Sequence, residues 1–245
     1  MELLVTLPNK KEVVMKEILY KDLRKFSLYD NLSITTAIDH LETFIVTKDL
    51  NIIEKFLSLL LLRQQCIGDT IPISSSKGTV DIQINHILKN IGYIENKCKE
   101  VTIDKVKYEL SFPTQFNCGD SDFIFSLIRS IEVDSEKVIL NSVTEQDYNQ
   151  ILRNLPKALY KHLTNFVDNS HDFLNLKVIE GRQNLNIEPV VLNVLSQEFS
   201  LFILRLFYVL SGDDYRHMIF MLSRRIKDIN FLINCTFKEI EDYFR

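Results

Sequence analysis

Apolar and polar positions at the start of the chain form two short β-prone runs separated by turn residues. The first run is Leu3 to Leu7, the turn is Pro8 to Lys11, and the second run is Val13 to Ile18. Apolar runs around Pro and Asn are typical of paired strands. The pattern therefore predicts an N-terminal β-hairpin.

Helical spacing follows the hairpin. Tyr20 to Tyr29 mixes apolar with charged residues and predicts a short helix that packs back on the hairpin. Apolar residues from Ala37 to Ile45 recur at helical intervals and predict a second helix. Ile52 to Leu62 is apolar almost all round, which predicts a third, deeply buried helix.

The middle of the chain changes to strand patterning. Gly68 to Gly78 combines helix breakers with small polar residues, so residues 68–79 are predicted as a linker. Three alternating runs predict strands at Val80 to Ile84, Val101 to Ile103 and Val106 to Leu110. Ile128 to Leu140 predicts a further hairpin, and together these strands predict a small, largely antiparallel sheet.

Helix-start signals mark the later part of the chain. Thr144 is a predicted N-cap for a helix to Asn154, and Pro156 suits the first turn of a helix that ends near Asp168. A strand pair is expected at Leu176 to Ile179 and Leu185 to Val191. Three C-terminal helices are expected at Leu192 to Leu210, at Asp213 to Lys227 and after Thr236, where Glu239 completes a capping box.

These elements predict an α+β protein with a hairpin and helices first, a small antiparallel β region in the middle and a helical C-terminal group. The expected parts are 1–67, the linker 68–79, the mixed region 80–191 and the helical region 192–245. A chain of 245 residues lies between one large domain and two small ones, so the alternative is a single compact unit.

Composition narrows the classes of function. Apolar residues make up 46% of the chain, with only 6 Gly and 5 Pro, which predicts a folded protein. The net charge of −4 comes from 29 basic and 33 acidic residues spread along the chain, which favours neither nucleic acid nor an anionic membrane as a partner. Four widely spaced cysteines, Cys66, Cys98, Cys118 and Cys235, are expected to be reduced thiols.

No export or membrane segment is expected. Met1 to Leu7 lacks the basic and apolar regions of a signal peptide. The most apolar stretch, Val190 to Leu210, contains Gln197, Glu198 and Arg205, which a spanning helix would accommodate only at high cost. A buried or interfacial helix is the better interpretation.

The chain contains no complete catalytic or metal-binding signature. No nucleophile elbow is present, and the segment from Gly68 to Gly78 lacks the Gly-Lys-Ser/Thr order of a phosphate-binding loop. His86, Cys98 and Cys118 could supply three metal ligands, but closely spaced ligand pairs are absent. No cofactor is therefore expected.

A second set of candidate metal ligands, two carboxylates and an imidazole, lies near the C-terminus. Asp213, Asp214 and His217 are one helical turn apart, although acids at that position also suit a helix N-terminus. Nearby basic residues predict a solvated helix face rather than a phosphate site, since acids dilute them and no stacking aromatics alternate with them. These basic residues are Arg216, Arg224, Arg225 and Lys227. His40, His162 and His171 lack acid or thiol partners in sequence and are interpreted as surface or packing residues.

Excess apolar surface is the strongest positive feature. The helix around Phe199 to Leu210 has hardly any polar face, so it must be covered either by the protein's own core or by a partner. The N-terminal hairpin offers an edge strand that can pair with another chain. The residues predicted to contact other proteins are Leu3, Val5, Leu7, Phe199, Phe202, Leu206 and Phe207.

Both ends of the chain resemble a known family. The N-terminal strand, the Leu7-Pro8 turn, the strand from Lys11 to Ile18 and the Tyr20-Lys21-Asp22-Leu23 segment are similar to the start of baseplate proteins from T4-like contractile-tailed phages. The C-terminal stretch from Phe220 to Arg225, with Cys235 to Glu241, is similar to the ends of the small hub-assembly proteins in that group.

The resemblance implies a non-enzymatic assembly factor or chaperone for the baseplate hub, made late in infection and acting in the host cytoplasm. Its partners would be other baseplate or hub proteins, with a homo-oligomer as a further option and no nucleic acid or membrane. Two alternatives remain, a structural hub subunit retained in the virion and, less favoured, a metal-dependent nucleic-acid-processing enzyme. The family implies no catalytic residues.

Overall fold

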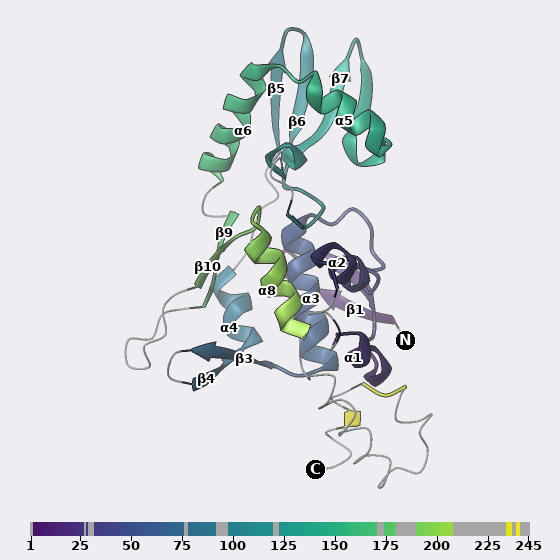
Figure 1. The fold of residues 1–245 in the computed structure, drawn as a ribbon, viewed down its shortest axis with the longest axis vertical. Coiled ribbons are helices and arrows are strands. Elements are labelled where there is room, and N and C mark those ends of the chain that lie inside the picture. The colour runs from purple at the N-terminus through teal and green to yellow at the C-terminus, as the bar shows by residue number, and fades with distance from the viewer. Residues whose placement is uncertain are drawn as a thin grey trace.

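The protein is an elongated α+β molecule in which one helix-rich part and one four-stranded sheet lie end to end (Figure 1). Buried apolar residues of both parts form one continuous core. The computed structural model describes residues 2–26, 28, 32–75, 78–91, 98–119, 123–170, 174–179, 190–207, 234–236 and 239–240. These residues confirm the predicted α+β class.

The helix-rich part begins with the predicted hairpin and three predicted helices. The hairpin consists of β1 (Glu2–Thr6) and β2 (Glu12–Lys16), paired antiparallel. The helices are α1 (Tyr20–Phe26), α2 (Ile34–Glu42) and α3 (Ile52–Cys66). All five elements are confirmed, with α3 four residues longer than the spacing predicted.

Helix α3 is the central element of this part because almost every side of it is covered. It begins at a capping box, in which the Asn51 side chain accepts from the backbone N–H of Glu54 at 2.9 Å and the Glu54 carboxylate accepts from the backbone N–H of Asn51 at 3.0 Å. Helix α8 (Gln197–Phe207) lies beside it (Figure 1), with the Phe56 and Phe199 rings 5.0 Å apart edge to face. The predicted burial of α3 is confirmed.

One charged side chain lies inside this core. Arg63 of α3 is 3% exposed and donates to three backbone carbonyls, those of Leu206 at 2.6 Å, Gly68 at 2.5 Å and Thr70 at 2.7 Å. Burial lowers the pKa of the guanidinium to about 10, although the Asp69 carboxylate acts in the opposite direction. Arg63 thereby ties the end of α3 to the end of α8 and to the start of the next strand.

The segment predicted as a linker is a β-hairpin instead. Strands β3 (Thr70–Ser75) and β4 (Gly78–Gln83) pair antiparallel, so the expectation of an irregular linker over residues 68–79 is wrong for those in the strands. The glycines and serines of this segment predict a loop. The β-branched residues of the hairpin, such as Ile71, Ile73, Val80 and Ile82, suit a strand. The division of the chain into separate parts remains a prediction.

A helix that sequence reasoning missed follows directly. Helix α4 (Ile84–Ile91) begins at Ile84, the last residue of the predicted strand Val80 to Ile84. Ile84 and Ile87 are fully buried and lie one turn apart on the helix. The apolar alternation before Ile84 masked this change of period, since the two patterns share that residue.

The four-stranded sheet is a meander in the order β5-β6-β7-β8. Its strands are β5 (Lys99–Ile103), β6 (Val106–Leu110), β7 (Ile128–Val133) and β8 (Glu136–Ile139). Asp104 and Lys105 link the first pair with φ values of 49° and 68°, and Asp134 and Ser135 link the last pair with 48° and 71°. Positive φ at both central residues is the geometry of a tight hairpin turn. The predicted antiparallel sheet is confirmed.

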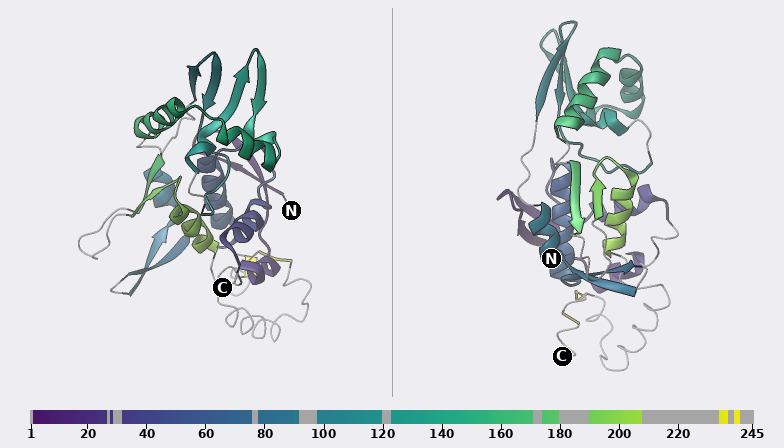
Figure 2. Two further views of the ribbon diagram at one scale, coloured as in Figure 1. Left: turned by 45° about the horizontal axis from the view of Figure 1, so that its top comes forward. Right: turned by 90° about the vertical axis from the view of Figure 1, so that its left-hand side faces the viewer.

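Two helices cover one face of this sheet (Figure 2). They are α5 (Glu145–Arg153), with the predicted N-cap Thr144, and α6 (Lys157–Asn169), which follows Pro156. Val101, Tyr108 and Leu110 are buried on the covered face. The opposite face carries charged residues, among them Lys107, Glu109 and Glu132.

The C-terminal region matches the prediction in part. Strands β9 (Asn175–Ile179) and β10 (Val190–Asn193) pair antiparallel, but of the predicted strand Leu185 to Val191 only Val190 and Val191 are among the described residues. The helix predicted from Leu192 begins only at Gln197, because the Ser196 hydroxyl accepts from the backbone N–H of Phe199 at 3.3 Å.

Near the end of the chain, Thr236 and Glu239 form both hydrogen bonds of the predicted capping box. The Glu239 carboxylate accepts from the backbone N–H of Thr236 at 2.7 Å, and the Thr236 hydroxyl accepts from the backbone N–H of Glu239 at 3.2 Å. The predicted helix from Asp213 to Lys227 lies outside the described residues.

Candidate protein-contact surface

The turn of the N-terminal hairpin is attached to the start of α3. Lys10 has a φ of 66°, and the backbone N–H of Leu7 donates to the carbonyl of Lys11 at 2.9 Å to close the turn. Asn9 Nδ2 and Lys11 Nζ donate to the two carboxylate oxygens of Glu54 at 3.1 and 3.0 Å. Glu54 thus serves both the capping box of α3 and the hairpin turn, which holds the hairpin at a defined angle to the helix.

The two outer edges of the hairpin differ. The outer edge of β2 is covered by the segment after α2, where the Lys16 N–H donates to the Phe44 carbonyl at 2.7 Å and the Val46 N–H donates to the Val14 carbonyl at 2.9 Å. The Val14 N–H in turn donates to the Thr47 hydroxyl at 2.8 Å. This edge is therefore already paired within the protein.

The outer edge of β1 carries no such cover among the residues that the structure describes. Hydrogen-bonded and non-bonded pairs alternate along an antiparallel ladder, and the bond between Leu7 and Lys11 sets the phase. The residues whose backbone N–H and C=O groups point away from β2 are Glu2, Leu4 and Thr6. No hydrogen bond from another described residue reaches these groups, so β1 presents an open strand edge at the margin of the molecule (Figure 1).

The side chains of β1 divide between core and solvent. Val5 is 3% exposed and points into the core, whereas Leu4 is 60% exposed on the opposite face. Glu2 and Thr6 are also exposed on that face. An exposed leucine beside free backbone groups is a feature of edge strands that bind another strand.

The structure places most of the predicted contact residues in the core. The covered residues are Val5, Leu7, Phe199, Leu206 and Phe207, whereas Leu3 and Phe202 are partly buried. In this conformation, the exposed Leu4 and the partly buried Leu3 of β1, and Leu201 and Phe202 of α8, are within reach of a partner. Sequence reasoning missed Leu4, because alternation shows that one face is buried but gives no sign of which strand edge stays open.

Helix α8 has its apolar surface covered from several sides by the protein itself. Phe199 lies 5.0 Å from the Phe56 ring and 6.2 Å from the Phe116 ring. The Ser200 hydroxyl donates to the carbonyl of Asn117 at 2.6 Å, and Asn117 Nδ2 donates to the carbonyl of Leu195 at 2.8 Å. These contacts favour the core interpretation for the described part of this helix over a partner interface.

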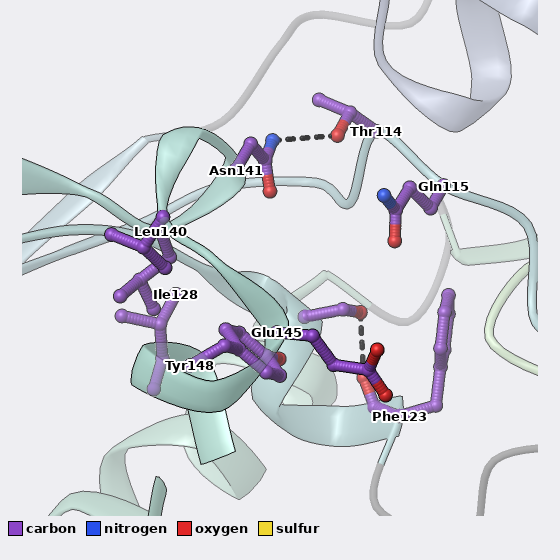
Figure 3. Close-up of a pocket in the computed structure, with 10 residues that line it drawn as sticks. Thr114, Gln115, Phe123, Ile128, Leu140, Asn141, Glu145 and Tyr148 are labelled. Atoms are coloured by element: carbon purple, nitrogen blue, oxygen red, sulfur yellow. Dashed lines mark hydrogen bonds between the residues drawn. The ribbon is translucent and has the colours of Figure 1, made fainter. Parts of the chain in front are cut away.

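A pocket of about 290 Å³ lies at the base of the four-stranded sheet (Figure 3). Its described lining is Thr114, Gln115, Phe123, Ser126, Ile128, Leu140, Asn141, Val143, Glu145 and Tyr148. Asn141 Nδ2 donates to the Thr114 hydroxyl at 2.7 Å, and the Ser126 hydroxyl donates to the Phe123 carbonyl at 2.6 Å (Figure 3). Three of its polar side chains thus have partners, because Asn141 and Thr114 bond to each other and Ser126 bonds to the backbone. This lining offers no imidazole or thiol to activate a nucleophile.

The model of the T4 bacteriophage base plate protein family matches residues 1–184. The chain belongs to this family. The match includes the N-terminal hairpin that carried the resemblance, and it ends before the C-terminal stretch from Phe220 to Glu241. No curated protein and no solved structure matches this baseplate protein. The family match shows a role related to the phage baseplate.

The metal-ligand candidates do not converge in the described part of this baseplate protein. No three His, Cys, Asp or Glu side chains among the described residues lie close enough to hold an ion, so His86, Cys98 and Cys118 are not brought together. Asp213, Asp214 and His217 lie outside the described residues, as do His171 and the basic residues from Arg216 to Lys227. His40 packs between the rings of Phe26 and Phe44, and burial lowers its pKa.

The four cysteines of this baseplate protein form no disulfide with one another. Cys66 is buried and its pKa is raised to about 11, chiefly by burial, whereas Cys98 is exposed. Among the residues that the structure describes, every helix is too short or too polar to cross a membrane.

Proposed function

We propose that this baseplate protein is a non-enzymatic assembly factor for the baseplate hub of a contractile phage tail. It binds hub components in the host cytoplasm through protein–protein contacts and favours their assembly-competent geometry. The N-terminal hairpin is its main contact element, and α8 contributes through Phe202.

The observation that carries the proposal is the open edge of β1 in a protein of the baseplate family. A free strand edge binds a partner chiefly through backbone hydrogen bonds, which form and break without any chemical step. The capping box at α3 and the Glu54 contacts to the turn hold this edge in place before a partner arrives. Because the edge strand is already ordered, its binding loses less free energy to conformational ordering than the binding of a mobile segment does.

The alternative is a structural hub subunit that stays in the virion. The same edge supports it equally, because a permanent partner and a transient one are recognised by the same backbone groups. The two functions differ in what remains after assembly: an assembly factor leaves the particle, and a subunit does not.

The test compares infected-cell lysate with purified phage particles by quantitative mass spectrometry. An assembly factor is expected in lysate, bound to a hub component, and depleted from particles relative to the other baseplate proteins. Recovery in particles at a fixed ratio to those proteins would replace the assembly role with the structural one. Metal analysis of the affinity-purified protein completes the experiment, because stoichiometric metal without a protein partner would favour the metal-dependent enzyme.

A further inference from the structure

The open edges of the protein are not equally suited to bind another strand. Natural edge strands are protected by lysine, proline, bulges or inward charges. On β8, the outward-facing backbone positions are Lys137 and Ile139, and Lys137 is held by the Glu109 carboxylate at 2.8 Å. Strand β1 has neither lysine nor proline and pairs with β2 in unbroken register. Its central outward residue is the exposed Leu4.

We infer that the outer edge of β1 pairs antiparallel with the same edge of a second copy of this chain, with Leu4 on the two-fold axis. In this register Leu4 faces Leu4 of the second copy, and Glu2 faces Thr6 of the second copy. All three outward-facing residues then meet a residue whose backbone groups also point outward, so each pair exchanges two hydrogen bonds. The two hairpins would form one continuous sheet of four strands.

The solvent-facing side chains fit this register. The central row of the joined sheet would be Val14 and Leu4 of one copy followed by Leu4 and Val14 of the other, because Leu4 pairs with Val14 within the hairpin. This row covers the leucine that is 60% exposed in the single chain. In the rows on either side, Glu2 lies between Lys16 of its own hairpin and Thr6 of the second copy. No two like charges stand directly opposite each other, which edge pairing requires.

The contact between the two β1 strands is short, so little surface is buried and the affinity is low. Five residues of strand bury much less than the roughly 1,200 Å² that stable complexes bury, so the dimer is expected to be weak and reversible. The inference rests on the proposed function for its biological role: the second copy would occupy the edge that a hub component uses, so the dimer and the hub complex would exclude each other. Dimerisation itself can be tested without any hub protein.

The test is thiol cross-linking of introduced cysteines in a background with Cys98→Ser, Cys118→Ser and Cys235→Ser, which removes the exposed and half-buried native thiols and leaves the buried Cys66. Leu4→Cys places two thiols across the two-fold axis, where facing Cα atoms are about 5.5 Å apart. Thr6→Cys is the matched control, because its two copies would be about 14 Å apart along the strands. A short thiol cross-linker is expected to join Leu4→Cys into dimers and leave Thr6→Cys monomeric. Equal cross-linking of both variants, or of neither, would overturn the inference.

Sedimentation of edge variants without introduced cysteines gives a second, independent measurement. Leu4→Lys is expected to weaken self-association about tenfold or more. Val133→Lys is the control: Val133 is 45% exposed and lies on the distant four-stranded sheet, so this variant is expected to leave self-association unchanged. A parent chain that stays monomeric at high micromolar concentration would overturn the inference. If such a monomer still captured a hub component, and Leu4→Lys abolished the capture, the proposed function would stand while the inference failed.

Discussion

The helix-rich part and the four-stranded sheet satisfy their charged groups in opposite ways. In the helix-rich part, the Arg63 guanidinium is buried and held by backbone carbonyls from two other segments, one of them 143 positions away. On the sheet, the Glu109 carboxylate lies on the exposed face and accepts from Lys137 at 2.8 Å, Ser130 at 2.9 Å and Arg129 at 3.2 Å. The first arrangement joins segments distant in sequence, and the second joins strands β6, β7 and β8 of one sheet.

The difference shows how burial changes the energetic meaning of a hydrogen bond. A buried acceptor that loses its donor cannot turn to water, so its full desolvation cost appears as lost stability. An exposed carboxylate that loses a cation is solvated again, and exposed ion pairs are worth about 1 kcal/mol or less. The helix-rich part should therefore be sensitive to single polar substitutions, and the sheet should tolerate them.

Arg63→Met is expected to have the largest effect. It removes the Arg63 donor from the buried carbonyl of Leu206 and from the part-buried carbonyls of Gly68 and Thr70. A buried acceptor that loses its donor costs about 1 to 3 kcal/mol, so a total loss of about 3 kcal/mol is expected. Urea unfolding followed by circular dichroism measures the change. Arg129→Met on the exposed sheet face is the matched control and is expected to cost less than about 1 kcal/mol. Similar losses for the two variants would remove the basis of the comparison.

Helix caps extend the comparison at a smaller scale. Asn51→Ala removes the buried capping box of α3 and is expected to cost about 2 kcal/mol, the upper end for N-caps. Thr144→Ala removes the exposed cap of α5 and is expected to cost about 0.5 kcal/mol. The same urea experiment measures both. A larger loss for Thr144→Ala than for Asn51→Ala would show that burial does not determine the contribution of a cap.

Glu109→Gln is expected to have a small effect that depends on pH. Hydrogen bonding from Lys137 is the main cause that lowers the pKa of the Glu109 carboxyl below its ordinary value of 4.5, with Ser130 and Arg129 acting in the same direction. A carboxyl with a lowered folded pKa stabilises the protein above its unfolded pKa, and this contribution is lost as pH falls through the folded value. Glu109→Gln should therefore cost up to about 1 kcal/mol near neutral pH, because the pair is screened by solvent.

The measurement is the difference in unfolding free energy between Glu109→Gln and the parent across a pH series. The difference should shrink as pH falls below 4.5 and should not reappear at lower pH. Lys137→Met removes the main partner of the carboxylate and should give the same trend. A difference that grows on acidification would contradict the assigned direction of the pKa shift.

Thiol reactivity separates the two parts without any change in stability. Cys98 is exposed at the entry to the sheet, whereas Cys66 is buried at the end of α3 with a pKa of about 11. Since the thiolate is the reactive form, iodoacetamide at neutral pH is expected to label Cys98 within minutes and Cys66 only after unfolding. Mass spectrometry of peptides from native and urea-treated samples gives both rates. Equal labelling of the two in the native protein would show that the end of α3 is open.

Local sequence signals determined many of the elements. Pro8 and Asn9 between two apolar runs predicted the hairpin of β1 and β2, and Thr144 and the Thr236–Glu239 pair predicted caps that the structure confirms. Turns and caps depend on residues three or four positions apart, so the signal is contained in a short window. The antiparallel sheet was predicted for the same reason, because each of its tight turns joins neighbouring strands.

Contacts between distant residues decided the rest. The change from strand to helix at Ile84 and the burial of Arg63 both depend on which segments meet in space. The open edge of β1 belongs to the same class, because it exists only where the segment after α2 covers β2 and no described residue covers β1. Alternation along a strand determined that Val5 or Leu4 would be buried. Only the tertiary structure decided that Leu4 is exposed beside a free edge, since the pairing of an edge is a property of its neighbours and not of its own residues.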